Sequence, residues 1–452
     1  MTYEQFIESK TQLGADGGFE PTFMPDFLFD FQKHLVQWAV RKGRAAIFAD
    51  CGLGKTAMQL VWAQNIVEKT NKPVLILTPL AVGAQTVKEG DKFAVECGQS
   101  RTGKVAGKIT VTNYQQLHKF NWQEFGGVVC DESSILKNFD GEIKKQVTEF
   151  MRRIQYRLLC TATAAPNDYI ELGTSSEALG GLGFVDMVNR FFKKAEQTTS
   201  RSDEFRAGIY RFRGHAEQNF WRWICSWARA CRMPSDIGFK NDGFNLPPLQ
   251  MVEHVIKCKT PNPDFLFDLP AHGLAEQRSE CRRTLTERCE QAAILADTKN
   301  PVIAWCHLNS EGDLLEKIIP GAVQVDGGDD DDFKEETFSA FSAGQIRVLV
   351  SKPVVAGYGL NWQHCAHQTF FPSHSFEQWY QAIRRSWRFG QKKQVRVDMI
   401  TSEGEADVLK NLQRKAAQAE QMFQNLVRLI NNELRIEKQN NAVNNQEIPS
   451  WL

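Results

Sequence analysis

The residues best suited to chemistry form a short glycine-rich turn at 49–56, Ala-Asp-Cys-Gly-Leu-Gly-Lys-Thr. Gly52 and Gly54 would let backbone N–H groups curl around a phosphate without Cβ clashes. Lys55 would reach the β- and γ-phosphates of a nucleotide, and Thr56 would ligate Mg²⁺. The turn therefore predicts a site for nucleotide phosphates and a magnesium ion.

An acidic pair further along the chain could complete this chemistry. Asp131 and Glu132 follow the apolar run at 127–130. Asp131 would hold Mg²⁺ through water, and Glu132 would orient or deprotonate an attacking water molecule. Such a pair would usually be a solvated turn, but its place downstream of a phosphate-binding turn favours a role in hydrolysis.

A phosphate-binding turn needs a strand before it and a helix after it, and the flanking residues supply both. Residues 26–41 and 56–67 have helical apolar spacing. Short apolar runs alternate with helical stretches, which indicates parallel sheets covered on both faces. The expected strands are 45–49, 74–77, 127–130 and 157–160 in a first α/β unit, and 302–305, 347–350 and 368–371 in a second.

Composition excludes several other classes of protein. Lys+Arg and Asp+Glu are both 54, so the net charge is zero, and 42% of the 452 residues are hydrophobic. These values exclude a histone-like protein, a fibre and a globally disordered chain. There is no run of 18 apolar residues and no signal peptide, which predicts a cytoplasmic protein without membrane contact. The 11 cysteines include no Cys-x-x-Cys, so buried free thiols are favoured over a zinc site at Cys281, Cys289 and His254.

Further motifs, in order along the chain, resemble those of superfamily-two helicases, and more closely their Swi/Snf-type branch of double-stranded DNA translocases. The segment 381–391, Gln-Ala-Ile-Arg-Arg-Ser-Trp-Arg-Phe-Gly-Gln, is the longest match. The matching segments are 31–32 (the adenine-reading glutamine), 49–56 (motif I), 78–80 (Ia), 112–114 (Ib), 131–138 (II), 161–163 (III), 357–361 (V) and 381–391 (VI).

This resemblance implies an α/β fold of two RecA-like parallel-sheet lobes, with helical insertions between them and a C-terminal helix. It also implies ATP and Mg²⁺ as cofactors, with ATP hydrolysed between the lobes, and Arg385 and Arg388 as arginine fingers. A guanidinium suits that role because it is always charged and binds phosphate oxygens bidentately. The implied nucleotide contacts are Gln32, Gly52, Gly54, Lys55, Thr56, Asp131 and Gly359, the metal ligands are Thr56 and Asp131, and the catalytic residues are Lys55, Glu132, Arg385 and Arg388.

The expected function is a DNA-dependent ATPase that acts as a double-stranded DNA translocase or helicase. Lys137-Asn138 and the Gly-Gln ending of motif VI favour duplex DNA over RNA, and a nuclease or a recombination or repair partner is conceivable. Ser134 replaces the histidine usual after Asp-Glu, and Arg384 replaces an aspartate. These departures suggest a divergent, phage- or prophage-like member in a bacterial or phage-infected cell. Ser134 and the altered motif III, with Ala164 and Pro166 at unusual positions, also keep open an ATP-gated nucleic-acid clamp or recruitment subunit with slow turnover.

The expected domain boundaries are a lead-in at 1–27, lobe 1 at 28–185, an insertion at 186–295, lobe 2 at 296–402, a helix at 403–438 and a polar tail at 439–452. In the insertion, residues 201–232 are rich in basic and aromatic side chains. Their arginines could contact DNA phosphates, whereas Phe220, Trp223 and Trp227 have the helical spacing of packing residues. The acidic run 329–332 favours a helix cap over a metal site. The C-terminal helix should pack on a lobe, with partner docking as the alternative.

Overall fold

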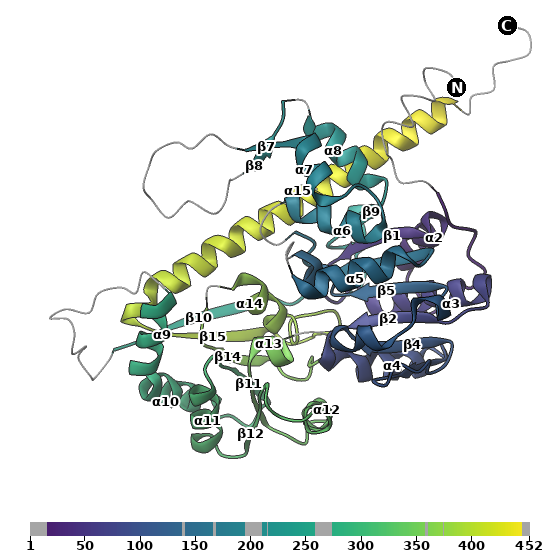
Figure 1. Ribbon diagram of the computed structural model, residues 1–452. Coiled ribbons are helices and arrows are strands. Elements are labelled where there is room, and N and C mark those ends of the chain that lie inside the picture. The colour runs from purple at the N-terminus through teal and green to yellow at the C-terminus, as the bar shows by residue number, and fades with distance from the viewer. Residues whose placement is uncertain are drawn as a thin grey trace, which may run out of the picture. The chain divides into compact units, whose positions relative to one another are not determined.

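The structure, a computed structural model, describes residues 16–137, 141–165, 169–194, 210–214, 216–257, 274–357, 360–373 and 375–444. The chain divides into two compact units, shown in Figure 1. Unit 1 comprises Met1–Asn241 and Gln421–Leu452, and unit 2 comprises Asp242–Glu420. Among the described helices, none is both long enough and apolar enough to cross a bilayer.

Unit 1 is built on a parallel sheet of apolar strands. Within the described residues the sheet has seven strands, in the order β3-β4-β2-β5-β6-β1-β9. Every residue of β2, β5 and β6 is buried, as expected for strands covered on both faces. The four strands predicted for this unit are confirmed to within one residue at each end. The strands are β1 (Arg44–Ala49), β2 (Val74–Thr78), β3 (Cys97–Gln99), β4 (Ile109–Asn113), β5 (Gly127–Asp131), β6 (Tyr156–Thr161) and β9 (Ala228–Cys231).

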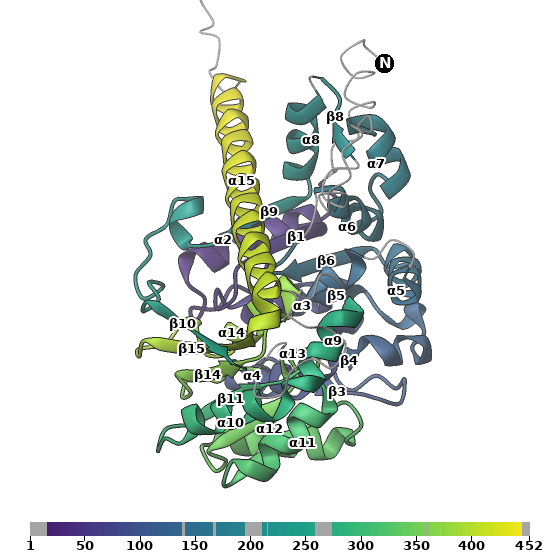
Figure 2. The same cartoon turned by 90° about the vertical axis from the view of Figure 1, so that its left-hand side faces the viewer.

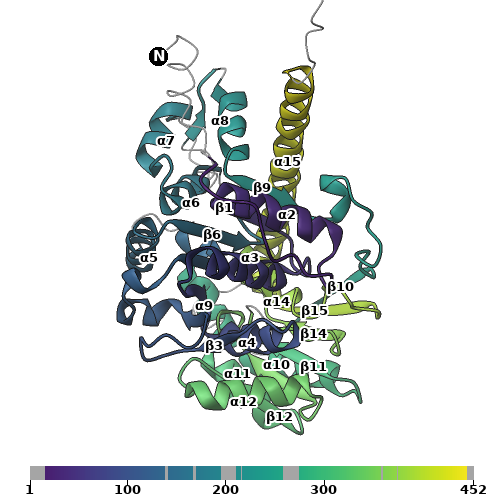
Figure 3. The ribbon, with the colours of Figure 1, turned by 90° about the vertical axis from the view of Figure 1, so that its right-hand side faces the viewer.

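Helices cover both faces of this sheet, as right-handed crossovers between parallel strands require. Figure 3 shows α2, α3 and α4 together on its near side. The helix predicted at 26–41 begins later, at Asp30, because Phe29 has extended backbone and its N–H is bonded by the Gln32 side chain. The helices on the sheet are α2 (Asp30–Lys42), α3 (Lys55–Thr70), α4 (Gly83–Lys92), α5 (Glu142–Arg152) and α6 (Leu172–Leu179).

The segment 186–295 is divided between the two units. Its strand β9 pairs in parallel with β1 and extends the first sheet, while β10 (Leu249–Ile256) pairs with β15 in the second. The other elements of this segment in unit 1 are α7 (Phe184–Phe191), which begins two residues before it, and α8 (Ala216–Cys225). Between these helices lies an antiparallel ribbon of β7 (Phe192–Lys194) and β8 (Tyr210–Phe212). Packing of the helically spaced aromatics is confirmed, since Phe220, Trp223 and Trp227 are all buried in the unit 1 core.

Unit 2 contains a second parallel sheet. Within the described residues it has six strands, in the order β10-β15-β14-β11-β13-β12. The three strands predicted for this unit are confirmed to within one residue, and they are β11 (Val302–Trp305), β13 (Val348–Ser351) and β14 (His367–Phe370). The other two strands are β12 (Ala322–Val325) and β15 (Val395–Ser402). The helices, several of which face the viewer in Figure 2, are α9 (Leu274–Arg283), α10 (Leu285–Ala296), α11 (Asn309–Ile318), α12 (Asp331–Ser342), α13 (Pro353–Ala356) and α14 (Phe376–Ile383).

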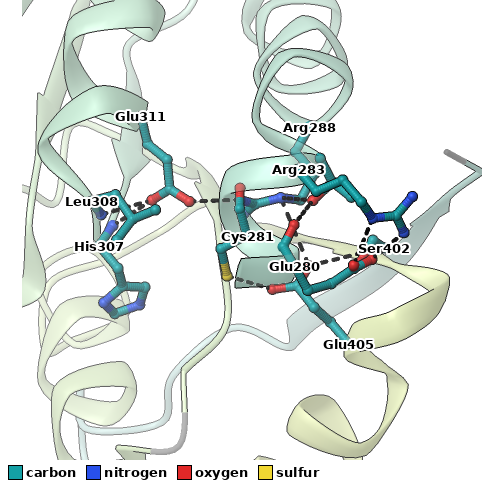
Figure 4. A network of polar contacts seen from close by, with 10 residues as sticks. Glu280, Cys281, Arg283, Arg288, His307, Leu308, Glu311, Ser402 and Glu405 are labelled. Carbon is teal, nitrogen blue, oxygen red and sulfur yellow. Dashed lines mark hydrogen bonds and ion pairs between the residues drawn. The ribbon is translucent and has the colours of Figure 1, made fainter. Parts of the chain in front are cut away.

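A buried polar network ties the helices of unit 2 to the end of β15 (Figure 4). Arg288 on α10 has 1% of its surface exposed. Its Nη2 donates to Glu311 Oε1 at 2.8 Å, and its Nε lies 3.7 Å from Glu405 Oε2. Glu311 also accepts hydrogen bonds from the backbone N–H groups of His307 and Leu308, directly after β11. The network therefore fixes the carboxyl end of β11, one of the places where a parallel sheet presents functional residues.

Two interpretations of the sequence concern possible metal sites in unit 2. Asp330 accepts hydrogen bonds from Asp332 N and Phe333 N at the start of α12, so the acidic run caps a helix as predicted. Cys281 donates to Glu405, whereas His254 is bonded to Asp398, so these two side chains do not form the imagined zinc site. No group of three metal-ligating side chains occurs among the described residues.

The C-terminal helix α15 (Ala406–Asn444) is longer than the predicted helix at 403–438 and runs into the predicted polar tail. Adding a residue to an existing helix costs far less than nucleating one, so polar residues can extend it. Leu426, Val427 and Ile430 belong to the unit 1 core, and Cys225 Sγ donates to the Ile430 carbonyl. The prediction that this helix packs on a lobe is therefore confirmed.

Candidate nucleotide site

The glycine-rich turn lies between the end of β1 and the start of α3. Gly52 and Gly54 have φ angles of +88° and +77°, in the left-handed region that favours glycine. Asp50 closes the start of the turn, because its Oδ1 accepts a hydrogen bond of 2.6 Å from Cys51 N. Asp50 N in turn donates to Cys231 O on β9. The residues thus form the strand–turn–helix unit that places a helix N-terminus beside a phosphate.

Gln32 on α2 connects the beginning of its own helix to this turn. Its Nε2 donates to the Leu53 carbonyl at 2.9 Å, and its Oε1 accepts from Phe29 N at 3.0 Å. A Cβ atom on Gly54 would lie 2.3 Å from Gln32 Nε2. Gly54 is therefore required both by its backbone angle and by the close approach of this side chain.

Lys55 is the first residue of α3, and its ammonium group lies among carboxylates. Its Nζ donates to Ala49 O at 3.1 Å. Burial lowers the pKa of Lys55, but the neighbouring groups Cys51, Glu132, Asp131 and Asp50 raise it, and the net shift is upward. Lys55 is therefore a permanent positive charge at the mouth of the turn.

Asp131, the last residue of β5, is buried and has a shifted pKa. Burial, followed by the charge of Glu132, raises its pKa to about 7, while a hydrogen bond from Gln59 and the charge of Lys55 lower it. The Gln59 Nε2 donates to Asp131 Oδ1 at 2.6 Å. Two adjacent buried carboxylates repel each other, and a divalent cation would relieve that repulsion. With the Thr56 hydroxyl at the start of α3, these are the oxygen donors that Mg²⁺ prefers, so the residues fit this ion.

Glu132 has an unusual backbone conformation. Its φ is +49°, in the left-handed region that favours glycine. A residue other than glycine is strained there, so the surrounding structure must stabilise this conformation. Thr161 at the end of β6 donates to Glu132 Oε2 at 3.4 Å, and Thr163 N donates to the Thr161 hydroxyl. The segment matched to motif III thus contacts the acidic pair directly.

The two predicted arginine fingers lie in unit 2, in the turn that follows α14. Arg385 Nη1 and Arg388 Nη1 both donate to the Leu360 carbonyl, at 3.1 and 3.0 Å. Arg385 is buried and donates twice more, to the backbone and side-chain oxygens of Gln381. Arg388 is half-buried. Gly359, a predicted nucleotide contact, lies outside the described residues.

The structure brings together the predicted site residues of unit 1, and it adds two that were not predicted as site residues: Gln59, outside the motifs, and Tyr114, in the segment 112–114 matched to motif Ib. Gln59, one helical turn beyond Lys55, bonds Asp131, and the Tyr114 hydroxyl donates to the Asp131 carbonyl. Gln59 is fully buried on a helix whose neighbouring buried residues are apolar. A polar residue at a core position was the signal that could have identified it.

Comparisons with known proteins support this fold assignment. No protein-family model matches the chain. A mouse protein described as the DNA annealing helicase and endonuclease ZRANB3 is 28% identical over 191 residues, which are 38% of this chain and 17% of that protein. The structure of S. cerevisiae Dbp5 bound to RNA and ADP BeF3 has a TM-score of 0.55 and 12% identity, and the match covers 88% of this chain and 93% of that one.

The Sulfolobus solfataricus SWI2/SNF2 ATPase core in complex with dsDNA has a TM-score of 0.41 and 16% identity, with 85% of this chain and 90% of that chain covered. The fold comparison rests on the first of these two structures. That match extends over 88% of this chain, so it spans both of the parallel sheets found here. The chain therefore has an α/β fold of two RecA-like parallel-sheet lobes.

Proposed function

We propose that this chain is a DNA-dependent ATPase that acts as a double-stranded DNA translocase or helicase. One observation carries the proposal: half-buried Lys55 lies with the buried carboxylates of Asp131 and Glu132 beside a glycine-rich turn. A fixed cation next to two carboxylates suits hydrolysis of a phosphoanhydride, where positioning and electrostatics supply most of the rate.

Each residue would have one task in this reaction. Lys55 offsets charge on the β- and γ-phosphates of ATP, and Thr56 and Asp131 would hold Mg²⁺, which supplies charge neutralisation when bound. Glu132 accepts a proton from the attacking water as the water oxygen bonds to the γ-phosphorus. The bond to the β-phosphate oxygen then breaks, and ADP and phosphate leave. Thr161 keeps the Glu132 carboxylate in place through its hydrogen bond.

The choice of DNA rests on the motif resemblance and on the relative's name. The Swi/Snf-type segments 131–138 and 381–391 favour duplex DNA over RNA. The mouse relative is described as a DNA annealing helicase, although the match covers only a small part of it. Arg385 and Arg388 are proposed to contact the γ-phosphate, with Gly359 as a further nucleotide contact.

Steady-state ATP hydrolysis with and without duplex DNA tests the proposal. We expect DNA to stimulate hydrolysis, and Lys55→Ala and Glu132→Gln each to abolish the stimulated rate. Lys104→Ala and Glu124→Gln remove the same kinds of side chain at exposed positions of unit 1 and should behave like the wild type. Full stimulated activity in either site variant would refute the assigned role.

The same assay distinguishes a second candidate, an ATP-gated clamp with slow turnover. Ser134 motivates it, since this buried serine stands two residues after Glu132 where relatives have a histidine that helps to couple hydrolysis to the second lobe. Negligible turnover, combined with a DNA affinity that changes when ATP binds, would favour the clamp.

A further inference from the structure

The ribbon of β7 and β8 in unit 1 has two chemically different faces. One face is aromatic: Phe192 and Phe212 stack with ring centroids 4.6 Å apart. Each also lies 5.3 Å from the ring of Phe220 on α8, which is completely buried. Figure 1 shows the ribbon beside α7 and α8. The two phenylalanines of this face are therefore packed within the unit, whereas Lys194 on the same face is exposed.

The other face is basic. Alternation along a strand turns Lys193 and Arg211 away from the aromatic face, and the two residues lie directly opposite each other in the antiparallel register. Arg213 follows directly after β8, and its Nε donates to the Phe192 carbonyl at 2.6 Å. All three side chains are exposed. With the residues that the structure describes, neither Lys193 nor Arg211 forms an ion pair.

This arrangement costs stability, because like charges directly opposite on two strands are destabilising by roughly 0.2–1 kcal/mol. In the described part of the chain, the acidic residues of the neighbouring elements are too few to balance this positive charge. In the described parts of α7, the ribbon and α8, the acidic residues are Asp186 and Glu217, and the basic residues are Arg190, Lys193, Lys194, Arg211, Arg213 and Arg222. On a chain of zero net charge, such a concentration is suited to a polyanion.

The geometry points to a second DNA-binding surface, formed by Lys193, Arg211 and Arg213, that contacts the phosphate backbone of duplex DNA outside the helicase motifs. The inference rests on the proposed function and names one part of its DNA contact. Single-stranded nucleic acid is normally bound by exposed aromatic rings that stack on bases, and the aromatics here face inward. A surface of cations without such rings matches the higher charge density of a duplex.

The test uses the full chain and the double variant Lys193→Gln/Arg211→Gln. Binding of a 30-base-pair duplex is measured by fluorescence anisotropy over a salt series, with a single strand of equal length as a second probe. Log K falls as log[salt] rises, and each lost phosphate contact makes this negative slope shallower by about 0.9. The double variant should therefore have a slope shallower by about 1.8. Its affinity at 0.1 M salt should be roughly ten- to a hundredfold lower. Lys193→Arg should retain binding.

Two further readouts separate loss of DNA contact from loss of structure. Removing the like-charge pair should leave the Tm of the double variant equal to the wild-type value or raise it, and ATP turnover without DNA should not change. The control Lys104→Gln/Lys145→Gln removes two exposed lysines elsewhere in unit 1 and should keep the wild-type slope.

Wild-type affinity and slope in the Lys193/Arg211 double variant, or a loss confined to the single strand, would overturn the assignment. If DNA stimulates ATP hydrolysis by the wild type and the double variant binds DNA equally well, only the proposed role of the ribbon surface is refuted. If DNA does not stimulate the wild type at all, the proposed function itself fails.

Discussion

The Gln59 side chain donates a 2.6 Å hydrogen bond to the Asp131 carboxylate and so links the helix that follows the glycine-rich turn to the end of β5. Both side chains are buried, and 72 residues separate them in the chain. Asp131 has a pKa raised to about 7, and the Gln59 bond is one of the contributions that lower it. Gln59 therefore helps to keep a buried carboxylate ionised and fixes the orientation of that carboxylate.

Gln59→Leu should raise the Mg²⁺ concentration needed for half-maximal ATP hydrolysis. Without the donor, the pKa of Asp131 rises further, so a larger fraction is protonated at pH 7. A hydrogen bond to a charged group contributes about 1.5–3 kcal/mol, which corresponds to a roughly ten- to hundredfold effect. The deficit should narrow at pH 9, where Asp131 ionises in both proteins. Gln64→Leu, at a less buried position of the same helix, serves as the control. If the higher Mg²⁺ requirement of Gln59→Leu did not change with pH, this explanation would be contradicted.

Asp131→Asn should stabilise the protein when Mg²⁺ is removed with EDTA, and more so at pH 8 than at pH 5. The pKa of Asp131 is about 7 in the folded protein, against an ordinary value near 4, so between these pH values the folded state binds more protons than the unfolded state. Stability from this residue therefore falls as pH rises through that window. Asparagine does not titrate, so the variant avoids the loss. Tm at the two pH values measures the effect, and an equal gain at both would show that ionisation is not the cause.

Arg388→Ala and Arg385→Ala should differ in stability although both arginines lie in motif VI. Arg385 is buried and donates three hydrogen bonds within unit 2, so its removal leaves buried acceptors unsatisfied, at about 1–3 kcal/mol each. Arg388 is only half-buried, and its loss should abolish stimulated hydrolysis with little change in Tm. Thermal unfolding and ATPase assays of both variants provide the comparison. A large drop in Tm for Arg388→Ala would assign that residue a structural role as well.

The sequence predicts strands that contain an unbroken apolar run, and it misses several in which polar or charged residues interrupt that run. β2 and β5 are buried on both faces, so their sequences are continuous apolar runs that can be recognised as strands. β9 includes Arg229 and β15 includes Asp398, and a buried charge argues against a core strand unless its partners are known. Arg229 donates to the carbonyls of Cys225 and Ala228, and Asp398 accepts from His254 and His367.

The candidate site shows the same limit. Lys55, Asp131 and Glu132 could be predicted because their local motifs set the backbone conformation. The Gln59 and Tyr114 contacts to Asp131 depend on three separate elements meeting in the folded unit, which no spacing along the chain encodes. The strained φ of Glu132 could not be read from its residue type either.

Arg288→Met should strongly destabilise unit 2. Arg288 is buried with Glu311 and Glu405, and removal of the cation leaves two carboxylates uncompensated (Figure 4). Breaking a buried ion pair in this way costs about 3–5 kcal/mol. Urea unfolding should show the loss, whereas Arg282→Met, at an exposed position on α9, should unfold like the wild type. Adding Glu311→Gln and Glu405→Gln to Arg288→Met removes the buried negative charge and should restore much of the stability. If the triple variant were no more stable than Arg288→Met alone, lost packing would be the cause, because neutralising the carboxylates cannot replace the volume of the arginine side chain.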